Sequence, residues 1–543
     1  MRIGLGCMRL EEDAVVAAAI ARGVVWLDTA RAYEGSEERI ARVLSSLAPP
    51  DRERVRVVTK VGMSRPGGAW VADGRARTIL EQARASVGAL GRPPEVLMLH
   101  APDPRVPLAT SVRALVRAKE EGLARSIGLS NPSRRDLDEL PSDAPIRAIE
   151  VALGPKHDAA ARAGMIAWCR ARDATLFAHS PLGGVAHAPR LARDQVLAAV
   201  AARRGATAAQ VMLAYLLALD DRVVVLPGAR RVETAAGAAF AGELTLTEED
   251  LAALDERFPK LGRRPPAPPV EPVAEVAIVM GIAGAGKSTL AERWDGWERL
   301  NRDTLGGSLA GIAKRLEARL AAGATRVVLD NTYLTRSARS EVVRVAHRAG
   351  ASVRCVHLDV SLADARINVA TRMLERHGAL LGGRELAARA REDPGLLLPA
   401  PLARMERQLE RPAEDEGFTS IETIAFARTH AGATGGVVIG LDDDVTRAPA
   451  EGPLLVLGWR PGADEAWCAS TLERIRSAVP GREVELGVCT HADGPPSCWC
   501  RPPLPGLWLA FARRRGLDPR ASTFVVSTAS HRTMATELGL RVV

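Results

Sequence analysis

A glycine-rich turn between an apolar run and a lysine–hydroxyl triplet is the clearest chemical signal in the sequence. Residues 276–290 read VAIVMGIAGAGKSTL, which places Gly-x-x-x-x-Gly-Lys-Ser after a predicted strand and before a predicted helix. Backbone N–H groups of such a turn cradle a β-phosphate where the helix dipole favours an anion. Lys287 then reaches the β- and γ-phosphates, and Ser288 is a ligand of Mg²⁺. The sequence predicts binding of ATP and Mg²⁺ by Gly281, Gly284, Gly286, Lys287, Ser288 and Thr289.

Residues that would complete a phosphoryl-transfer site follow this turn along the chain. We expect a strand in ERLNRDTLGG to end at Asp303, whose carboxylate would accept the proton of an attacking hydroxyl; the alternative is a helix cap. TRVVLDNTYL places Asp330 at another strand end, where a second carboxylate would organise Mg²⁺. The helical stretch DARINVATRMLERHG carries Arg366, Arg372 and Arg376, which either clamp the γ-phosphate or form a solvated basic face.

Residues 273–430 resemble the kinase domain of polynucleotide 5′-kinases. The resemblance rests on NRDTLG, VVLDNT, the pattern R-x-N-x-x-x-R and RMERQLERPAEDEGFTSI, in the order found in the animal end-healing enzymes. It implies ATP-dependent phosphorylation of a nucleic-acid 5′-hydroxyl, with Asp303 as the catalytic base, Arg302 near the acceptor and Arg372 at the transferred phosphate. Related P-loop kinases act on small alcohols, so a small alcohol is the alternative acceptor. The choice between DNA and RNA stays open.

Eight short apolar runs alternate with helical stretches in the first half of the chain. They read RIGLGC, VVWLDTA, VRVVTK, EVLMLH, ARSIGLS, IRAIEVA, TLFAHS and RVVVLPG. This count over about 250 residues predicts a (β/α)8 TIM barrel, whose chemistry sits at the carboxyl ends of the strands. Asp28, Lys60 and His100 lie at such ends, and Tyr33 follows Asp28 closely. A tyrosine whose pKa is lowered by a lysine ammonium can protonate a carbonyl oxygen while a nicotinamide supplies hydride.

The same segment, residues 1–260, resembles the aldo-keto reductase family. The match includes DTARAYEGSE, VVTKVG, LMLHAPDP, GLSN, HSPLGG and VLPGARR in the family's order. It implies reduction of a small carbonyl compound by a catalytic tetrad of Asp28, Tyr33, Lys60 and His100. It also implies NADP(H) binding by Ser130, Asn131, Ser180, Leu182, Gly228, Arg230 and Arg231.

The segment departs from the family pattern at three places. Glu150 stands where the family has an amide, and His179 stands where an aromatic ring often stacks on the nicotinamide. The asparagine expected after PGARR is missing from VETAAGAA. These changes weaken the expected affinity for the cofactor, and the alternative is a barrel that has kept its fold for another use.

The last hundred residues hold two further groups of chemistry-bearing side chains. GGVVIGLDDDV is an apolar run followed by Asp442-x-Asp444, a pair that suits a phosphatase with one nucleophilic carboxylate and one acid–base carboxylate. A second group offers three thiolates and an imidazole, a set that binds Zn²⁺ tetrahedrally. Its members are Cys489, His491, Cys498 and Cys500.

Residues 435–543 resemble the haloacid-dehalogenase superfamily, in particular its sugar-bisphosphate and histidinol-phosphate phosphatases. Those enzymes carry the same C-x-H…C-x-C loop followed by C-R-K-P-x-P-G, which here reads CRPPLPG, with Pro502 in place of the lysine. Gly458 stands where a hydroxyl residue is expected, and FVVSTASHRT leaves Thr528 and Arg532 in place of the acids that bind Mg²⁺. We therefore expect a degenerate Rossmann-like domain with a structural zinc loop, used for docking or nucleic-acid positioning rather than for phosphatase activity.

Composition sets the limits within which these motifs are interpreted. At about 150 residues per domain, 543 residues predict three or four domains. The expected segments are the barrel at 1–260, a proline-rich linker at 261–272, the P-loop kinase-like domain at 273–430 and the degenerate domain at 435–543. The net charge of +8 is carried mostly by dispersed arginines, which fits nucleic acid but also solvated helix faces. The sequence has no apolar run long enough to span a membrane and no signal-peptide pattern, which predicts a cytoplasmic protein without a membrane partner.

The motifs together predict a multidomain enzyme that combines a kinase with a carbonyl reductase. The leading hypothesis is phosphorylation of a nucleic-acid 5′-hydroxyl in end repair. A second hypothesis is metabolic: the barrel reduces a carbonyl compound and the kinase phosphorylates the resulting alcohol. A third treats the outer domains as non-catalytic binding modules around one kinase.

Overall fold

The structure is a computed structural model that describes residues 1–184, 186–262, 267–429, 434–492 and 496–543. Parts of the predicted linker 261–272, of the junction between the expected segments 273–430 and 435–543, and of the cysteine–histidine loop 489–500 lie outside these residues. The chain groups into two compact units, Met1–Ala267 with Arg336–Arg344, and Pro268–Thr335 with Val345–Val543. None of the described helices has the length and apolar character needed to cross a membrane.

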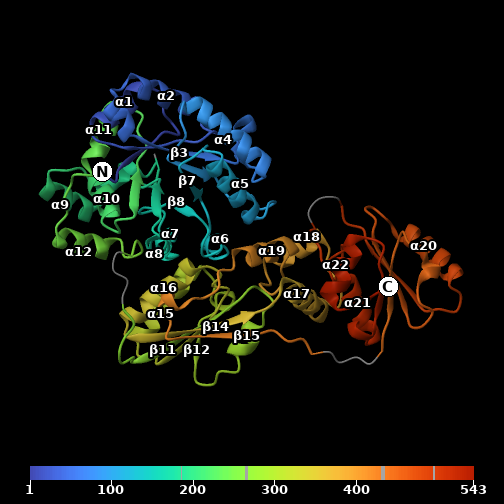
Figure 1. Cartoon of the computed structure of the whole chain (residues 1–543). Helices are drawn as coiled ribbons and strands as arrows, with labels where there is room; N and C mark the ends of the chain where they lie inside the picture. The colour runs from blue at the N-terminus through green and yellow to red at the C-terminus, as the bar shows by residue number, and fades with distance from the viewer. Residues whose placement is uncertain (185, 263–266, 430–433, 493–495) are drawn as a thin grey trace. The chain divides into compact units, whose positions relative to one another are not determined.

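The first unit contains a closed barrel of eight parallel strands (blue to green in Figure 1). Parallel bridges between Ile3 and Val225 and between Gly6 and Gly228 join the first strand to the last and close it. All eight runs expected from the sequence form these strands. They are β1 (Gly4–Gly6), β2 (Trp26–Asp28), β3 (Arg56–Val61), β6 (Val96–Leu99), β7 (Ser126–Ser130), β8 (Ile146–Ala152), β9 (Thr175–His179) and β10 (Val223–Leu226).

Helices cover the outside of this barrel, because each strand returns to the next through a helical crossover. They are α1 (Asp13–Ala21), α2 (Ser36–Ser46), α3 (Pro49–Arg54), α4 (Ala76–Leu90), α5 (Leu108–Glu120), α6 (Arg134–Asp138), α7 (Ala159–Arg162), α8 (Met165–Ala171), α9 (Gln195–Arg204), α10 (Ala208–Leu217), α11 (Val232–Phe240) and α12 (Glu248–Arg257). Buried side chains such as Val58, Met98 and Phe177 fill the interior, so the barrel is a packed core. A short hairpin, β4 (Met63–Ser64) and β5 (Val71–Ala72), extends from the end of β3.

The second unit begins with a five-stranded parallel sheet, hereafter the P-loop sheet, in the order β12-β13-β11-β14-β15. Its strands are β11 (Ala274–Met280), β12 (Glu298–Arg299), β13 (Arg326–Asp330), β14 (Ala351–Asp359) and β15 (Ser420–Ala425). The central strand β11 is buried from Val276 to Met280, as expected for an apolar run covered on both faces. The glycine-rich turn follows β11, between its two neighbours β13 and β14, where parallel sheets of this kind bind ligands.

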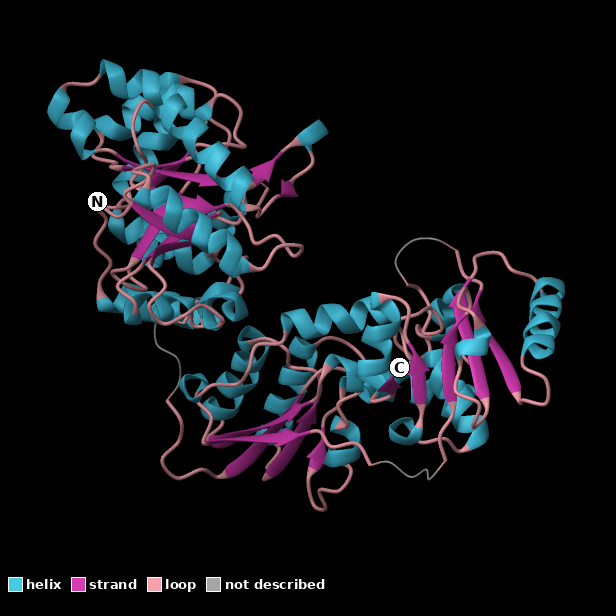
Figure 2. Ribbon diagram, turned by 45° about the vertical axis from the view of Figure 1, so that its right-hand side comes forward, coloured by secondary structure: helices cyan, strands magenta, loops and turns pink. Residues whose placement is uncertain are grey.

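Helices connect these strands on both faces of the sheet (Figure 2). They are α13 (Lys287–Ala291), α14 (Arg302–Leu305), α15 (Leu309–Ala321), α16 (Arg336–Arg348), α17 (Leu362–His377), α18 (Gly383–Arg389) and α19 (Pro399–Gln408). One expectation was wrong: β12 ends at Arg299, and Asp303 lies in the single turn of α14 rather than at a strand end. The reason is Asn301, whose side chain accepts hydrogen bonds from the N–H groups of Asp303 and Thr304 and so starts a helix.

A second five-stranded parallel sheet, hereafter the C-terminal sheet, has the order β18-β17-β16-β19-β20. Its strands are β16 (Val437–Gly440), β17 (Leu454–Trp459), β18 (Val484–Cys489), β19 (Thr523–Val525) and β20 (Arg541–Val542), connected by α20 (Glu465–Ala478), α21 (Gly506–Arg515) and α22 (Ala529–Leu538). The order reverses at the central strand β16, which makes this a doubly wound α/β arrangement. Both sheets of the second unit are drawn in magenta in Figure 2.

Candidate functional site

The barrel brings the four predicted reductase residues together at the carboxyl ends of its strands. Asp28 ends β2, Lys60 lies near the end of β3 and His100 follows β6. The Lys60 ammonium donates a hydrogen bond to Asp28 and lies 5.4 Å from the centre of the Tyr33 ring. The rings of Tyr33 and His100 meet edge to face, with centroids 5.6 Å apart. All four side chains are buried, so their charges act on one another through a medium of low dielectric constant.

A second carboxylate, Glu150 on β8, lies on the same lysine. Its Oε2 is 3.1 Å from Lys60 Nζ, and its side chain is only 4% exposed. Burial raises the pKa of Asp28 to about 8, and the negative charge of Glu150 adds to this rise. Burial opposes the charge of Lys60, but the two carboxylates outweigh it and raise its pKa. The lysine therefore stays charged between two competing carboxyl groups.

At physiological pH Tyr33 keeps its proton, whereas His100 is uncharged. Burial raises the pKa of Tyr33 to about 12 although Lys60 acts in the opposite direction. The lowering of the tyrosine pKa expected from the sequence is thus outweighed by burial and by the two carboxylates. Burial, with a smaller contribution from Lys60, lowers the pKa of His100 to about 3. Tyr33 is consequently a neutral acid beside a neutral imidazole.

An aromatic wall that the sequence did not identify completes this end of the barrel. Trp70 lies on the hairpin between β4 and β5, with its ring 6.2 Å from Tyr33 and 5.5 Å from His100, and it is 47% exposed. The guanidinium group of Arg65 lies over the Trp70 ring, 4.4 Å from its centre. A large, half-exposed ring beside two buried polar residues is suited to contact a substrate at the barrel mouth. Nothing in the local sequence signals this role, because the hairpin is an insertion between a strand and its helix.

Three of the residues expected at the cofactor, Ser130, Asn131 and Ser180, form one hydrogen-bonded rim together with His179. Asn131 Nδ2 donates to Ser130 Oγ at 3.1 Å, and Asn131 Oδ1 lies 3.1 Å from His179 Nε2. His179 Nδ1 lies 3.1 Å from Ser180 Oγ. Asn131 and Ser180 both have a φ of 53°, which is costly for residues with a side chain and is typical of ligand clamps.

The remaining cofactor candidates lie at two other places on the barrel. Leu182 is partly buried against the barrel core. Gly228 pairs with Gly6 where the barrel closes. Arg230 and Arg231 are exposed at the start of α11, and Arg230 forms an ion pair with Glu11 at 2.6 Å. Two exposed guanidinium groups at a helix start are suited to bind a phosphate monoester.

The glycine-rich turn has the conformation that its sequence requires. Gly281, Gly284 and Gly286 all have positive φ, and Gly286 immediately precedes α13. A side chain at Gly284 would lie 2.9 Å from the carbonyl oxygen of Ala365 on α17. Lys287 Nζ donates hydrogen bonds to the carbonyl oxygens of Gly281 and Ile282 at 3.0 and 2.8 Å.

Electrostatics prepare this turn for an anion. Burial lowers the pKa of Lys287 to about 8, and the carboxylates of Asp330 and Asp303 act against this effect. Ser288 and Thr289 are exposed on the first turn of α13, so their hydroxyl groups are accessible. The turn therefore offers one ammonium, free hydroxyl groups and a helix start to a phosphate group.

Two asparagines hold the helical turn that carries Asp303 at the carboxyl edge of the P-loop sheet. Asn301 Oδ1 accepts from Asp303 N at 2.6 Å, while Asn301 Nδ2 donates to the carbonyl oxygen of Asp330 at 2.8 Å. Asn331 Oδ1 accepts from Arg302 N at 2.8 Å. The Asp303 side chain is 55% exposed, so its carboxylate is open to an acceptor from solvent.

Asp330 lies at the end of β13 as expected, but its carboxylate has a partner that the sequence did not reveal. Arg299 binds it with two hydrogen bonds, at 3.0 and 2.7 Å, and the Asp330 side chain is fully buried. A charged pair of this geometry is among the strong ones. The structure therefore places Asp330 in an ion pair with the neighbouring strand.

The three arginines of α17 have different surroundings. Arg366 pairs with Glu537 at 2.6 Å and Arg376 with Asp393 at 2.7 Å. Arg372 lies between them on the helix; burial and the neighbouring Arg376 lower its pKa, while Asp303 acts in the opposite direction. Arg372 is thus the arginine of α17 that shares the electrostatic environment of Asp303 and Lys287.

The four predicted zinc ligands form one cluster whose donor atoms all lie within 4.8 Å of one another. Cys489 Sγ lies 3.7 Å from Cys498 Sγ, and His491 Nδ1 lies 3.4 and 3.3 Å from Cys489 Sγ and Cys500 Sγ. Tetrahedral zinc with its usual bond lengths separates two sulfur ligands by about 3.8 Å and sulfur from nitrogen by about 3.5 Å. The sulfur atoms of Cys498 and Cys500 lie closer than this, 3.1 Å apart. The donor set of three thiols and one imidazole is of the kind that binds Zn²⁺.

The residues of the phosphatase-like pattern do not form a shared acid site. Asp442 is 83% exposed and pairs with Arg460 at 2.8 Å, whereas Asp444 accepts hydrogen bonds from Thr446. The aspartate between them, Asp443, accepts from Ser527 Oγ at 2.7 Å, and this hydroxyl lies 3.2 Å from His531 Nδ1. The sequence suggested Thr528 and Arg532 at this place, but Thr528 caps α22.

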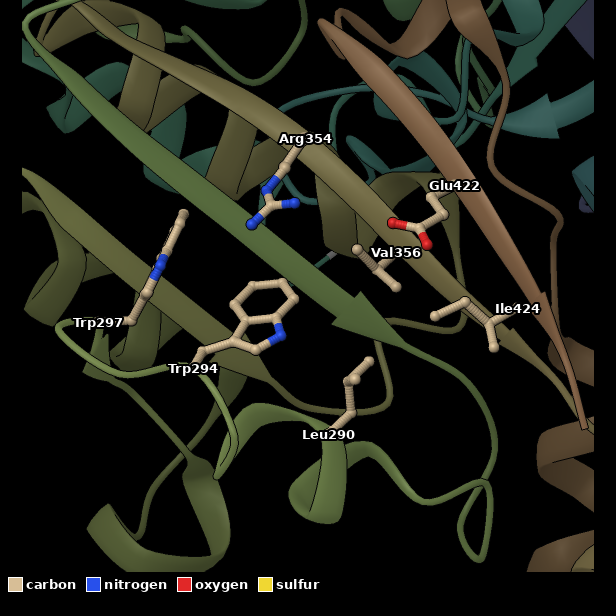
Figure 3. A pocket seen from close by; sticks show the side chains of 7 residues that line it. All are labelled: Leu290, Trp294, Trp297, Arg354, Val356, Glu422 and Ile424. Carbon is tan, nitrogen blue, oxygen red and sulfur yellow. The ribbon is translucent and has the colours of Figure 1, made fainter.

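A hollow of about 300 Å³ opens on one face of the P-loop sheet (Figure 3). It is lined by Leu290, Trp294, Trp297, Arg354, Val356, Glu422 and Ile424. The guanidinium of Arg354 lies 4.5 Å from the Trp294 ring and 5.0 Å from the Trp297 ring, and Glu275 binds its Nε at 3.0 Å. Because an arginine of the chain already stacks on both rings, we do not count this hollow among the candidate sites.

Comparison with known proteins agrees with two of the three expected domains. Residues 2–257 match the model of the aldo/keto reductase family, and residues 276–391 match the model of an AAA domain. An aldo-keto reductase of Mycobacterium avium (strain 104) is 29% identical over 265 residues, which are 47% of this chain and 84% of the relative. The methylglyoxal reductase DkgB of Salmonella typhimurium is 28% identical over 264 residues, 46% of this chain and 92% of the relative.

Solved structures match the same half of the chain. The crystal structure of an aldo-keto reductase from Klebsiella pneumoniae in complex with NADPH has 24% sequence identity and a TM-score of 0.42, covering 48% of this chain and 91% of that one. Taken with the barrel, its residue cluster and the glycine-rich turn, the family matches lead to one conclusion. The chain contains an aldo/keto reductase domain at residues 2–257, followed by a P-loop, kinase-like AAA domain at residues 276–391.

Proposed function

We propose that the protein is a bifunctional enzyme that reduces carbonyl compounds with NADP(H) and transfers the γ-phosphate of ATP to a hydroxyl group. The observation that carries the reductase half is the buried Lys60, held by Asp28 and Glu150 beside a protonated Tyr33. The observation that carries the phosphotransfer half is Lys287 in the glycine-rich turn, together with Asp303 and Arg372 in its electrostatic neighbourhood. Each half has its own acid–base residue and its own anion-binding residues.

In the reductase, the protein moves one proton and bound NADP(H) supplies the hydride. The strained rim at Asn131 and Ser180 and the exposed Arg230 and Arg231 fit a nicotinamide dinucleotide with a ribose phosphate. Tyr33 gives its proton to the carbonyl oxygen, and the neutral His100 donates a hydrogen bond that orients this oxygen. Trp70 excludes water from one side. The charge on Lys60 stabilises the tyrosinate that remains.

In the phosphotransferase, the acceptor hydroxyl loses its proton to Asp303. Lys287 exchanges its bonds to the turn carbonyls for bonds to the β- and γ-phosphates, and Arg372 offsets the charge that develops on the transferred group. Ser288 would hold a Mg²⁺ ion, which would supply positive charge beside the phosphates. Asp330 would act on this ion from its ion pair with Arg299, through its charge and its hydrogen bonds.

The acceptor that we propose is a nucleic-acid 5′-hydroxyl. Two features support it: the resemblance of the segment around Asp303 to polynucleotide kinases, and the 55% exposure of the Asp303 side chain, which leaves room for a polymer end. The fusion to a reductase favours a second candidate, a small alcohol produced by the barrel. In that case methylglyoxal is the first carbonyl to test, because a relative of the barrel is a methylglyoxal reductase.

The test uses γ-labelled ATP with 5′-hydroxyl DNA and RNA oligonucleotides. We expect label transfer by the wild type and a loss of at least about a hundredfold in Lys287→Ala and Asp303→Ala. Glu317→Ala, which removes an exposed carboxylate from α15, is the matched control and should transfer normally. Transfer to alcohols but to no oligonucleotide would replace the proposed acceptor by the second candidate.

For the C-terminal sheet we propose a structural role with a bound Zn²⁺. The proposal is supported by the donor atoms of the Cys₃His cluster, which all lie within 4.8 Å of one another, whereas the carboxylates of Asp442 and Asp444 have separate partners. Zinc stoichiometry of the purified protein by atomic emission tests this. One zinc per chain that is lost in Cys500→Ser is the expected result, and no bound zinc in the wild type would refute it.

A further inference from the structure

The cysteine–histidine loop extends into the core of the P-loop domain. Trp499 lies between two of the zinc-type ligands, Cys498 and Cys500, and its side chain is fully buried. It packs in one hydrophobic cluster with residues that follow α17 in the segment 273–430, which include Leu381, Leu386, Leu396 and Leu402. Its indole N–H donates a hydrogen bond to the carbonyl oxygen of Leu397 at 2.8 Å. The loop and the segment 380–402 therefore form one packed core.

Two adjacent glycines make room for this loop. A side chain carbon at Gly382 would lie 2.8 Å from His491 Nε2, and one at Gly383 would lie 2.5 Å from Ser497 Oγ. Gly506, at the start of α21, also makes room for this contact, since a side-chain carbon there would lie 2.9 Å from Leu380 Cδ1. Contacts this short are essentially forbidden, so only glycine lets the loop sit here. Gly382 and Gly383, at the start of α18, therefore leave the space that the cysteine–histidine loop occupies; we call this pair the glycine seat.

The helix that carries Arg372 is fixed by the same domain. Ile367 on α17 is buried in the core of the C-terminal sheet beside Trp508 and Phe511. One residue earlier, Arg366 pairs with Glu537 on α22, and both side chains are 21% exposed. The opposite face of α17 contacts the glycine-rich turn, where Asn368 Nδ2 donates to the carbonyl oxygen of Gly284 at 2.8 Å. Helix α17 is thus held between the nucleotide turn and the C-terminal domain.

We propose that the metal-bound Cys₃His loop is a positioning element of the phosphotransferase site. Seated on Gly382 and Gly383 and anchored by Trp499, it fixes the segment after α17, and through it holds Arg372 and Asn368 against the glycine-rich turn. This inference rests on the proposed phosphotransfer function. Without the ion, three cysteine side chains and a histidine lose their common centre, and the buried Trp499 loses the loop geometry that inserts it. Zinc occupancy is thereby coupled to nucleotide binding.

The test uses the full-length protein with Zn²⁺ alone as the added metal. Two variants separate the effect of the ion from the effect of the contact between the loop and the two glycines. Cys500→Ser removes a metal ligand, whereas Gly383→Leu keeps all four ligands but fills the space beside Ser497. Gly311→Leu is the matched control, because a side chain at Gly311 meets no heavy atom closer than 3.7 Å. Three readouts are made on each protein: zinc stoichiometry, the Kd of a fluorescent ATP analogue, and the rate of proteolysis within residues 380–399.

We expect Gly383→Leu and Cys500→Ser to weaken binding of the ATP analogue by about tenfold, a usual size for coupling between two sites. Both should be cut faster within 380–399, while NADPH-dependent turnover by the barrel stays at the wild-type rate and serves as the folding control. ATP-analogue binding and proteolysis equal to the wild type in both variants would overturn the proposal. Failure of the proposed function is a different result: the analogue would then bind equally to wild type and Lys287→Ala, and the proteolysis rates alone would decide whether the loop positions this segment.

Discussion

At the scale of single residues, the chemistry of the reductase cluster depends on which side chain carries the proton to be transferred. Tyr33 is the group with a proton to give, because its pKa is raised to about 12 by burial while His100 is neutral. Replacing Tyr33 by Phe should lower kcat for carbonyl reduction by 10²- to 10⁴-fold, roughly the usual contribution of a general acid. Binding of NADPH, measured by fluorescence titration, should remain.

The matched control for this variant is another buried tyrosine of the barrel. Tyr215 on α10 is fully buried, and its hydroxyl group donates a hydrogen bond to Asp255 Oδ1 at 2.8 Å. Tyr215→Phe should cost about 1 kcal/mol of stability for the lost hydrogen bond and leave turnover unchanged. Equal loss of turnover in both variants would show that the effect comes from the fold and not from proton transfer.

Glu150 sets the pH range over which Tyr33 stays protonated. Its negative charge contributes to the raised pKa of Tyr33, so Glu150→Gln should lower that pKa. Reduction needs the protonated tyrosine, which is present below its pKa and lost as the pH rises through it. The alkaline fall in kcat/KM should therefore come at lower pH in Glu150→Gln than in the wild type, whose fall is centred near pH 12. In profiles measured with NADPH from pH 6 to 11, the variant should lose more of its kcat/KM at the alkaline end than the wild type. Superimposable profiles would contradict the coupling.

Lys287 should make nucleotide binding dependent on pH. Its pKa is lowered to about 8 by burial, yet it must be charged to bind the phosphates. Below pH 8 the ammonium is already present; above pH 8 a proton must be taken up, and the Kd for ATP should rise by about tenfold per pH unit. Isothermal titration calorimetry from pH 7 to 9.5 measures this Kd for ATP. A flat Kd over that range would mean that the lysine keeps its charge without nucleotide.

At the scale of elements, the capping of α14 determines where the proposed base lies. Asn301 binds the N–H groups of Asp303 and Thr304 and also the carbonyl group of Asp330. Asn301→Ala should release this turn and reduce phosphotransfer by about tenfold, as expected for loss of a cap worth 1–2 kcal/mol. Ser308→Ala, which removes the cap of the neighbouring helix α15, should leave phosphotransfer unaffected. Steady-state kinetics measures this effect. A lower kcat with an unchanged KM for ATP would indicate that the nucleotide site is intact and that the position of Asp303 has changed.

The elements that could be predicted from sequence are those whose pattern is local. The eight barrel strands are apolar runs bounded by polar residues, and the glycine-rich turn has a fixed spacing, so both were recovered. Asp303 was assigned to a strand because the cap formed by Asn301 depends on a side chain orientation that spacing does not encode. The pairing of Arg299 with Asp330 joins neighbouring strands 31 residues apart in the chain. Trp70 and the contact of Ser527 with Asp443 likewise arise only when separate segments meet.

At the scale of the whole molecule, the two proposed activities belong to two compact units with separate cores. The second unit joins two parallel sheets through shared side chains, Trp499 in one core and Ile367 in the other. The C-terminal sheet is therefore part of the structure that carries the proposed phosphotransferase residues, although its own carboxylates do not gather at one site. The proposed phosphotransfer could thus require this part of the chain even though it has no shared acid site of its own.

The relation between the two activities follows from this division. Substitutions in separate cores with no shared partners act independently. Phosphorylation of a 5′-hydroxyl oligonucleotide should proceed at the same rate without NADPH, and in Tyr33→Phe as in the wild type. The measurement is label transfer from γ-labelled ATP in three mixtures: oligonucleotide alone, oligonucleotide with methylglyoxal and NADPH, and methylglyoxal with NADPH. Label on a small product that requires both NADPH and Tyr33, with none on the oligonucleotide, would instead establish that the reductase makes the hydroxyl that the kinase-like domain phosphorylates.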